Sequence, residues 1–150
     1  MLSRIHHVGI VVRNLEQAYG FWRDVLGLPV QKAATVTDQG VRAALLTIGE
    51  SEIELLEPLT ATSGIGKFLA KRGEGLHHMC FATDDVAGEL ERARAKGIRL
   101  IDERPRPGLA GMICFLHPAS THGVLIEYAE PFPEDHGAGA PAGNTGIPHP

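Results

Sequence analysis

The sequence predicts an α+β domain made of two β-α-β-β-β modules, and three observations support this prediction. A short β-rich run with two adjacent histidines occurs twice, as IHHVGIVV at residues 5–12 and as LHHMCFAT at residues 76–83. Each run precedes a segment with apolar residues at helical spacing, and three strand-length runs follow. The halves are offset by 71 residues. Because such a repeat defines the architecture, we expect modules at about residues 4–59 and 75–131 of one domain, residues 1–131.

The first module is expected to contain one helix and four strands. After the first strand, Asn14 precedes LEQAYGFWRDVLGL, and Gln17 stands three positions later as a capping partner. Gly27 is a plausible stop, so the helix is predicted to run from Leu15 to this glycine. Three strand-length runs follow, PVQKAATV, VRAALLTIG and EIELLEPL.

The second module repeats this order. Asp84 or Asp85 is expected to cap VAGELERARAKG, a helix that ends at Gly97. Three strands are predicted after it, at IRLIDE, MICFLHP and GVLIEYA. A short amphipathic helix is expected between the modules, around Phe68 in TATSGIGKFLAKRGEG. Residues 132–150 are rich in proline and glycine and are predicted to be a disordered tail.

Composition and charge narrow the class of protein. Apolar residues make up 43% of the 150 residues and charged residues 21%, which is close to globular averages. A net charge of −4 shows no basic excess of the kind that nucleic-acid binding uses. No apolar run reaches the roughly 18 residues of a membrane span, and no apolar signal segment precedes the first strand. We therefore expect a cytoplasmic protein that binds neither nucleic acid nor membrane, with Cys80 and Cys114 as reduced thiols.

The two histidine pairs are the first candidate functional residues. Successive side chains on a strand point to opposite faces, so at most one histidine of each pair is expected at a given site. On each strand a small residue stands two positions after the second histidine, Gly9 after His7 and Cys80 after His78. The open volume favours a concave site lined by the second histidines, with the first histidines on the side of the helices or at its margin.

Each module also has a glutamate inside its last strand. Glu54 in EIELLEP lies 47 residues after His7, and Glu127 in GVLIEYAEP lies 49 residues after His78. A buried ionised carboxylate is costly without a partner, so each glutamate either faces outward or is paired, protonated or metal-bound. Two imidazoles and two carboxylates suit a divalent ion such as Co, Ni, Mn, Zn or Fe. The duplicated placement favours one metal site formed by all four residues.

Several longer segments resemble the methylmalonyl-CoA epimerase family, within the glyoxalase-like vicinal-oxygen-chelate superfamily, over about residues 5–131. These segments are IHHVGIVVRNLEQAYGFWRDVLGL, QGVRAALLTIGESEIELLEPL, IGKFLAKRGEGLHHMCF and FLHPASTHGVLIEYAEP. The resemblance implies a cup-shaped mixed sheet around a divalent metal, usually in a homodimer. Its metal ligands match His7, His78 and Glu127, with Gln or Glu at the position of Glu54. The implied reaction is α-proton abstraction from methylmalonyl-CoA, or a related 2-alkylmalonyl-CoA, with Glu127 as an acid/base.

Two departures from the family pattern affect this interpretation. The family's second proton-transferring glutamate, in QGVxE, falls at Ala43. Either Glu54, another residue or a metal-bound water therefore supplies the second proton, or the protein acts on a different substrate. Many relatives have lysine in the HPxST loop where this chain has Ala119. The remaining polar residues near the site in this loop are His117, Ser120, Thr121 and His122, and the first three are predicted to bind substrate. Basic candidates for contacts with CoA are Arg42, Lys67, Lys71 and Arg72.

Three other functions stay open at this point. A glyoxalase I-type lactoylglutathione lyase also moves a proton near a metal and commonly has glutamate at the position of Glu54. An iron-dependent ring-cleaving dioxygenase uses two histidines and one carboxylate, but a fourth protein ligand would crowd oxygen and substrate. A non-catalytic member of the superfamily would bind a small hydrophobic molecule.

Overall fold

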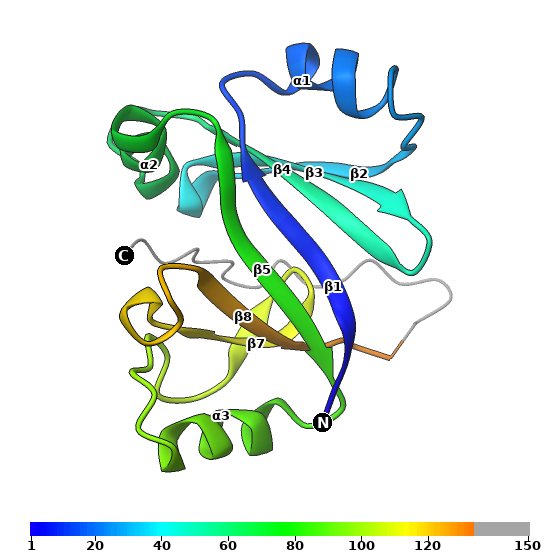
Figure 1. Cartoon of the computed structure of the whole chain (residues 1–150). Helices are drawn as coiled ribbons and strands as arrows, with labels where there is room; N and C mark the ends of the chain where they lie inside the picture. Colours follow the sequence, from blue (N-terminus) through cyan, green and yellow to red (C-terminus); the bar gives the residue numbers. More distant parts are fainter. Residues whose placement is uncertain (134–150) are drawn as a thin grey trace.

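Two antiparallel strands, β1 (Leu2–Val11) and β5 (Gly75–Thr83), cross the middle of the structure side by side (Figure 1). This computed structural model describes residues 1–133. All strands belong to one eight-stranded sheet with the order β2-β3-β4-β1-β5-β8-β7-β6. The other strands are β2 (Val30–Val36), β3 (Val41–Ile48), β4 (Ser51–Pro58), β6 (Arg106–Gly108), β7 (Gly111–Leu116) and β8 (Leu125–Glu130). Of the predicted tail, residues 134–150 lie outside the described residues.

The two halves of the sheet repeat one topology. Outward from the centre, the first half reads β1-β4-β3-β2 and the second β5-β8-β7-β6. In both halves the inner pair is parallel, β1 with β4 and β5 with β8, and the outer pairs are antiparallel. The sheet curls so that its halves fan away from β1 and β5 (Figure 1). The predicted fold, two β-α-β-β-β modules in a cup-shaped mixed sheet, is confirmed.

Of the three helices in the described residues, two cover the outer side of the sheet, one for each half, and the third packs against the opposite face. The helices are α1 (Leu15–Trp22), α2 (Gly64–Arg72) between the modules, and α3 (Val86–Ala95), with short 3-10 turns η1 (Thr37–Gln39) and η2 (Pro118–Ser120). On β4, Leu55 packs with Leu15 of α1, whereas Leu56 packs on the opposite side with Ile65 of α2. On β8, Tyr128 packs against Leu90 of α3. Successive side chains on β4 and β8 alternate between the two faces of the sheet. The side chains on the face opposite α1 and α3 therefore point into the cup.

Helix starts agree with the sequence, but the first helix is shorter than predicted. The Asn14 side chain accepts a hydrogen bond from the Gln17 N–H at 2.9 Å, and Asp85 caps α3 in the same way. However, α1 ends at Trp22 rather than near Gly27. The Asp24 N–H bonds to the carbonyl of Tyr19, five residues back, which interrupts the regular helical ladder. Turns then lead to Gly27, whose φ of 75° reverses the chain.

The predicted strand at IRLIDE, residues 98–103, is wrong. Only Leu100 forms an isolated bridge, with Leu116, and the edge strand β6 begins at Arg106. The side chain of Asp102 accepts a hydrogen bond from the Phe115 N–H at 2.8 Å, which replaces the next ladder carbonyl. Pro105 follows in the loop and has no N–H to donate. The ladder therefore stops and resumes only at β6.

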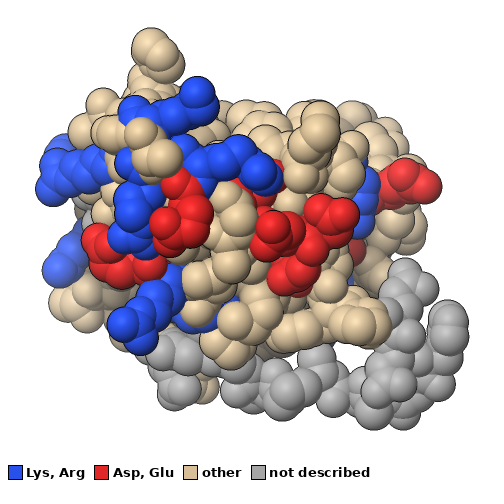
Figure 2. Space-filling view, turned by 90° about the horizontal axis from the view of Figure 1, so that it is seen from below, with Lys and Arg blue, Asp and Glu red and all other residues tan. Residues whose placement is uncertain are grey.

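The surface around α3 carries both signs of charge. Figure 2, seen from below, shows lysine and arginine side chains intermixed with aspartate and glutamate. On this helix Arg92 pairs with Glu89, and Arg94 pairs with Glu103 of the following loop at 2.8 Å. The described part of this face therefore carries charges of both signs and is not uniformly basic. Among the described residues, no helix is long and apolar enough to cross a membrane.

Candidate metal centre

The central strand pair brings the second histidine of each module to the inner face of the cup. In the β1–β5 pairing, His7 lies opposite Cys80 and His78 lies opposite Gly9. Each histidine thus faces a small residue on the other strand. Cys80 and Cys114 are both free and buried thiols.

Four polar side chains meet between these strands and their neighbours. The Nε2 atoms of His7 and His78 are 3.0 Å apart. Glu127, from β8, places Oε2 3.2 Å from His7 Nε2 and 3.3 Å from His78 Nε2. Glu54, from β4, places Oε1 3.5 Å from His78 Nε2. No more than 5% of any of these residues is exposed. We refer to them as the four-residue cluster.

The donor set of this cluster fits a divalent cation. Ligand atoms of His7, Glu54 and His78 all lie within 4.8 Å of one another, and Glu127 contacts both imidazoles. Two nitrogens that bind one ion at about 2.1 Å and at right angles are about 3.0 Å apart. This separation matches the 3.0 Å between the two Nε2 atoms. The double positive charge of such a cation would also compensate the negative charges of the two buried carboxylates.

Burial and neighbouring charges make the two histidines electrostatically different. Burial alone would lower the pKa of His7, but the charges of Glu127 and Glu54 outweigh it and raise that pKa to about 9. Burial and the charges of His7 and His77 lower the pKa of His78 well below its usual value. Burial also raises the pKa of Glu54 to about 7. Without a cation, His7 therefore carries a proton at neutral pH and His78 does not.

The first histidine of each pair departs from simple strand alternation. The β1–β5 pairing skips His6 on one strand and His77 on the other, so each is the extra residue of a β-bulge. As a result, each ring contacts the ring of the next histidine, with an Nδ1–Nδ1 distance of 2.9 Å in both pairs. The His77 ring also packs against Phe68 of α2. The expectation that neighbouring histidines point to opposite faces is therefore wrong for their rings.

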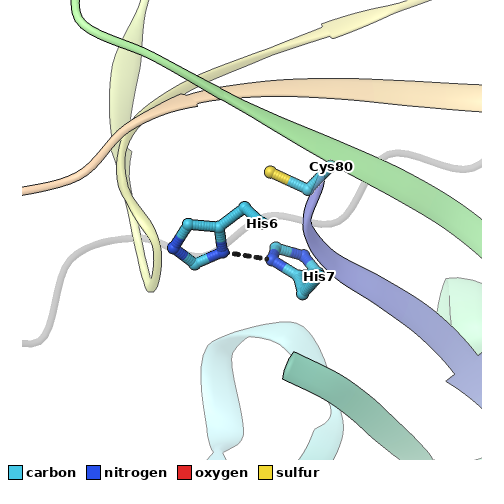
Figure 3. Close-up of side chains that lie close together, drawn as sticks. All are labelled: His6, His7 and Cys80. Carbon is cyan, nitrogen blue, oxygen red and sulfur yellow. Dashed lines mark hydrogen bonds between the residues drawn. The ribbon is translucent and has the colours of Figure 1, made fainter. Parts of the chain in front are cut away.

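His6, His7 and Cys80 form a second group of close side chains (Figure 3). Burial, together with the charges of Glu127 and Glu54, raises the pKa of the Cys80 thiol far above its usual value. The thiol therefore stays protonated and donates a hydrogen bond to Glu127. Because a cysteine binds metals as the thiolate, this group is a poorer metal site than the four-residue cluster.

Gly9 is required by the position of the His78 ring. A Cβ atom at this glycine would lie 2.1 Å from Cε1 and 2.4 Å from Nδ1 of that ring. The ring therefore lies directly on the β1 backbone, and any side chain at position 9 would displace it. The small residue in the sequence indicated open volume here, but it did not indicate that an imidazole of the opposite strand fills this volume.

Two cavities of different character adjoin the cluster. A cavity of about 30 Å³ has mainly apolar walls, formed by Val36, Val41, Ala43, Leu56, Ile113 and Phe115. The other, of about 400 Å³, has more polar walls that include His6, Gln31 and Glu52. Both reach His7 and Glu54, whereas only the smaller one reaches His78 and Glu127. Ala43, the first departure from the family pattern, thus stands in an apolar wall close to the cluster.

The three residues predicted to bind substrate lie in the loop between β7 and β8. His117 accepts a hydrogen bond from the Ala119 N–H at 3.0 Å, and Ser120 accepts one from the Arg99 N–H at 2.9 Å. The Thr121 hydroxyl bonds to the Val124 carbonyl. Among the described residues, none of the three lines either cavity. Their observed contacts hold the loop, and substrate binding by them stays a prediction.

Arg42, a candidate for contacts with CoA, already has acidic partners. Its guanidinium pairs with Glu16 at 3.0 Å and with Glu57 at 3.3 Å. Glu57 also accepts a hydrogen bond from the Leu15 N–H at the start of α1. Arg42 therefore ties β3 to α1, and the basic residues of α2 are more accessible candidates.

Comparison with known proteins identifies the family to which this chain belongs. Residues 6–115 match the family described as the Glyoxalase/Bleomycin resistance protein/Dioxygenase superfamily, and the chain belongs to it. The ethylmalonyl-CoA/methylmalonyl-CoA epimerase of Cereibacter sphaeroides is 35% identical, over 85% of this chain and 97% of that protein.

Solved structures narrow the relationship within that family. A methylmalonyl-CoA epimerase in complex with methylmalonyl-CoA and NH4+ is 42% identical, with a TM-score of 0.79 over 85% of this chain and 94% of its own. The methylmalonyl-CoA epimerase of Mycobacterium tuberculosis is 38% identical, with a TM-score of 0.82 over 88% of this chain and 90% of its own. The resemblance to methylmalonyl-CoA epimerases is therefore confirmed, and the chain is an isomerase of the racemase and epimerase class.

Proposed function

We propose that this chain epimerises methylmalonyl-CoA or a related 2-alkylmalonyl-CoA with the help of one divalent cation. The observation that carries the proposal is the convergence of two buried imidazoles and two buried carboxylates beside an apolar cavity. The relatives named above support the substrate class. The proposal includes His7, Glu54, His78 and Glu127 as metal ligands, with Co, Ni, Mn, Zn or Fe as the ion. A homodimer in the cytoplasm is also part of it.

The chemistry requires removal of a proton that lies between two carbonyl groups. In a 2-alkylmalonyl thioester the α-hydrogen is flanked by a carboxylate carbon and a thioester carbon. A divalent cation at the cluster would stabilise the negative charge that develops on the oxygens as this proton leaves. The protein has to place an acid/base on each face of the α-carbon, because inversion needs the proton returned to the opposite face.

The two glutamates of the cluster are the proposed acid/base pair. Glu127 comes from β8 and Glu54 from β4, on opposite sides of the central strands β1 and β5. We assign Glu127 to removal of the proton on one face and Glu54 to its return on the other. Both carboxylates are buried, so bulk water has little access to compete for the proton.

Proton exchange provides the direct test. Wild-type protein loaded with Co²⁺ is expected to incorporate deuterium at C2 of methylmalonyl-CoA in D₂O and to interconvert its two epimers. Glu127→Gln is expected to reduce both rates by a factor of about 10² to 10⁴, typical of a lost acid/base. Glu54→Gln is expected to reduce epimerisation more than exchange, because one-face exchange needs only Glu127. Glu50→Gln, at an exposed turn, is the matched control and is expected to retain both rates.

The same preparation distinguishes the alternatives. Conversion of the methylglyoxal–glutathione adduct without exchange into methylmalonyl-CoA would identify a glyoxalase I-type lyase instead. Oxygen consumption with a catechol substrate after loading with Fe²⁺ would identify a ring-cleaving dioxygenase. No turnover of any of these substrates, together with tight binding of an apolar compound, would indicate a binding protein.

A further inference from the structure

Each cluster histidine is directly preceded by another histidine, and these two preceding residues occupy equivalent and unusual positions in the two modules. His6 and His77 are each skipped by the β1–β5 pairing. A β-bulge adds one residue to a strand and re-aims its side chain. Here it brings each ring to within 2.9 Å of the next histidine, Nδ1 to Nδ1, and the paired rings meet edge to face, with centroids 5.1 Å and 5.2 Å apart. The same contact therefore occurs twice, once in each module.

The hydrogen bonds in these pairs determine where the protons must lie when a cation is bound. An Nδ1–Nδ1 contact needs one nitrogen that donates and one that accepts. The Nε2 atoms of His7 and His78 face each other and the carboxylate of Glu127. To bind a cation there, each Nε2 must offer a lone pair, so the proton of the neutral ring lies on Nδ1. Nδ1 of His7 then donates to His6, and Nδ1 of His78 donates to His77.

We propose that His6 and His77 are positioning residues, which accept these Nδ1–H bonds and hold the Nε2 lone pairs toward the cluster. Metal-bound histidines usually donate their second N–H to a carboxylate, a backbone carbonyl or water. In this chain a second imidazole takes that role in both modules. The inference rests on the proposed metal site. It explains why the histidines occur as pairs, since one histidine of each pair binds and the other orients.

The two positions differ in burial, which decides the choice of variants. His77 is 6% exposed and packs against Phe68, so its replacement also disturbs the contact with α2. His6 is half-buried and borders the larger cavity. His6→Ala therefore removes the acceptor with less effect on the core. His6→Asn keeps an acceptor oxygen and is the conservative variant that should restore part of the effect.

Cobalt affinity is the main readout, and it is independent of catalysis. Calorimetric titration of metal-free protein with Co²⁺ should give a dissociation constant about 10- to 100-fold higher for His6→Ala than for wild type. His6→Asn should lie between the two. The control is His122→Asn, which replaces an exposed histidine with φ of 58° by a residue that tolerates this backbone conformation. It should leave the affinity unchanged.

A spectroscopic measurement on wild-type protein avoids any folding defect of a variant. In the ¹⁵N-labelled, Zn²⁺-loaded protein, Nδ1 of His7 and of His78 should carry a proton. Each should show scalar coupling across the hydrogen bond to Nδ1 of its neighbouring histidine. Protons on Nε2 of the cluster histidines, or a His6→Ala affinity equal to that of wild type, would overturn the proposal.

The outcomes separate this inference from the proposed function. If wild type does not bind Co²⁺, both the metal site and the positioning role fail. If His6→Ala weakens Co²⁺ binding while wild type lacks epimerase activity, the positioning role is supported and only the reaction is wrong. If wild type is an active epimerase whose Co²⁺ affinity does not respond to His6→Ala, the positioning role alone is wrong.

Discussion

The two modules share the geometry at the centre of the sheet and differ toward its edges. Each contributes one histidine from its first strand and one glutamate from its last strand to the four-residue cluster. The outer strands diverge, because β2 has seven residues and its counterpart β6 has only three. The cavity wall contains Val36 and Val41 from the first module but Phe115 from the second. The two modules are therefore equivalent where the four side chains of the cluster meet, and they differ at the outer strands and in the wall of the smaller cavity.

A second difference lies within the cluster itself. The residue two positions after the cluster histidine is Gly9 in the first module and Cys80 in the second. Since the strands run antiparallel, His78 lies on a glycine backbone, whereas His7 lies opposite a buried thiol. His78 is consequently the more buried ring, at 1% exposure against 3%. Equivalent positions in the repeat thus provide different surroundings for two otherwise equivalent ligands.

The largest expected effect comes from adding one methyl group at Gly9. Gly9→Ala would place Cβ within 3 Å of three atoms of the His78 ring, so the ring must leave its position. We expect Co²⁺ affinity to fall at least about 100-fold, as a displaced ligand would cause. Calorimetric titration with Co²⁺ measures this change, and circular dichroism checks that the sheet is retained.

Cys80→Ala is the matched variant in the other module. It removes the thiol that donates a hydrogen bond to Glu127 but does not displace the His7 ring, so Co²⁺ affinity should fall only about tenfold. Stability should fall by roughly 1 kcal/mol, as expected for a small core truncation. Equal losses of affinity in Gly9→Ala and Cys80→Ala would contradict the asymmetry between the modules.

The pH dependence of metal binding should report the different protonation of the two histidines. In the metal-free protein the pKa of His7 is raised to about 9 and that of Glu54 to about 7, whereas the pKa of His78 is low. A cation displaces bound protons, so its affinity rises with pH until the ligands are deprotonated. We expect about a tenfold gain per pH unit between pH 7 and 9, from His7, and a steeper gain below pH 7, where Glu54 is also protonated.

Calorimetry in buffers with different ionisation enthalpies measures the number of protons released. At pH 8 the expected value is about one proton, from His7 alone, because Glu54 is already ionised and His78 holds no proton there. His7→Ala should abolish this release, as well as weakening binding. A release of two protons at pH 8 would mean that the two modules supply equally protonated histidines.

Ala43 offers a way to test the apolar wall of the first module. Its side chain is 4% exposed and lines the smaller cavity, so a carboxylate at this position would reach the region beside the cluster. If return of the proton by Glu54 limits turnover, Ala43→Glu should raise kcat for epimerisation by up to about 10²-fold, the lower limit of what a positioned acid/base contributes. Ala43→Gln is the control, because it has a similar volume but cannot transfer a proton. A rate for Ala43→Glu no higher than that of Ala43→Gln would show that Glu54 already supplies this step.

The parts of the structure that depend on periodicity could be predicted from the sequence. The repeat of two histidines and a glutamate located His7, Glu54, His78 and Glu127, because a period of two residues assigns side chains to one face. The bulges at His6 and His77 could not be predicted, since they arise from the register between two strands 71 residues apart in the sequence. Local sequence carries no direct information on that register.

Errors at the ends of elements have a similar origin. The run IRLIDE has the composition of a strand, but a side-chain acceptor replaces the backbone carbonyl at Asp102. The predicted helix beyond Trp22 has apolar residues at helical spacing, yet Val25 is 70% exposed, because no element among the described residues covers it. In both segments, contacts distant in sequence decide the outcome over local propensity.

The smallest expected effect concerns the shortened edge strand of the second module. Asp102→Ala removes the acceptor for the Phe115 N–H, on a residue that is 2% exposed, and should lower the free energy of unfolding by about 1–3 kcal/mol. Asp24→Ala in the first module removes only an exposed pair with Arg23, and should change stability by no more than about 0.5 kcal/mol. Urea unfolding compares the two variants. If both have wild-type stability, the Asp102 side chain does not end the ladder, and the loss of N–H donors at Pro105 and Pro107 must account for the difference between β2 and β6.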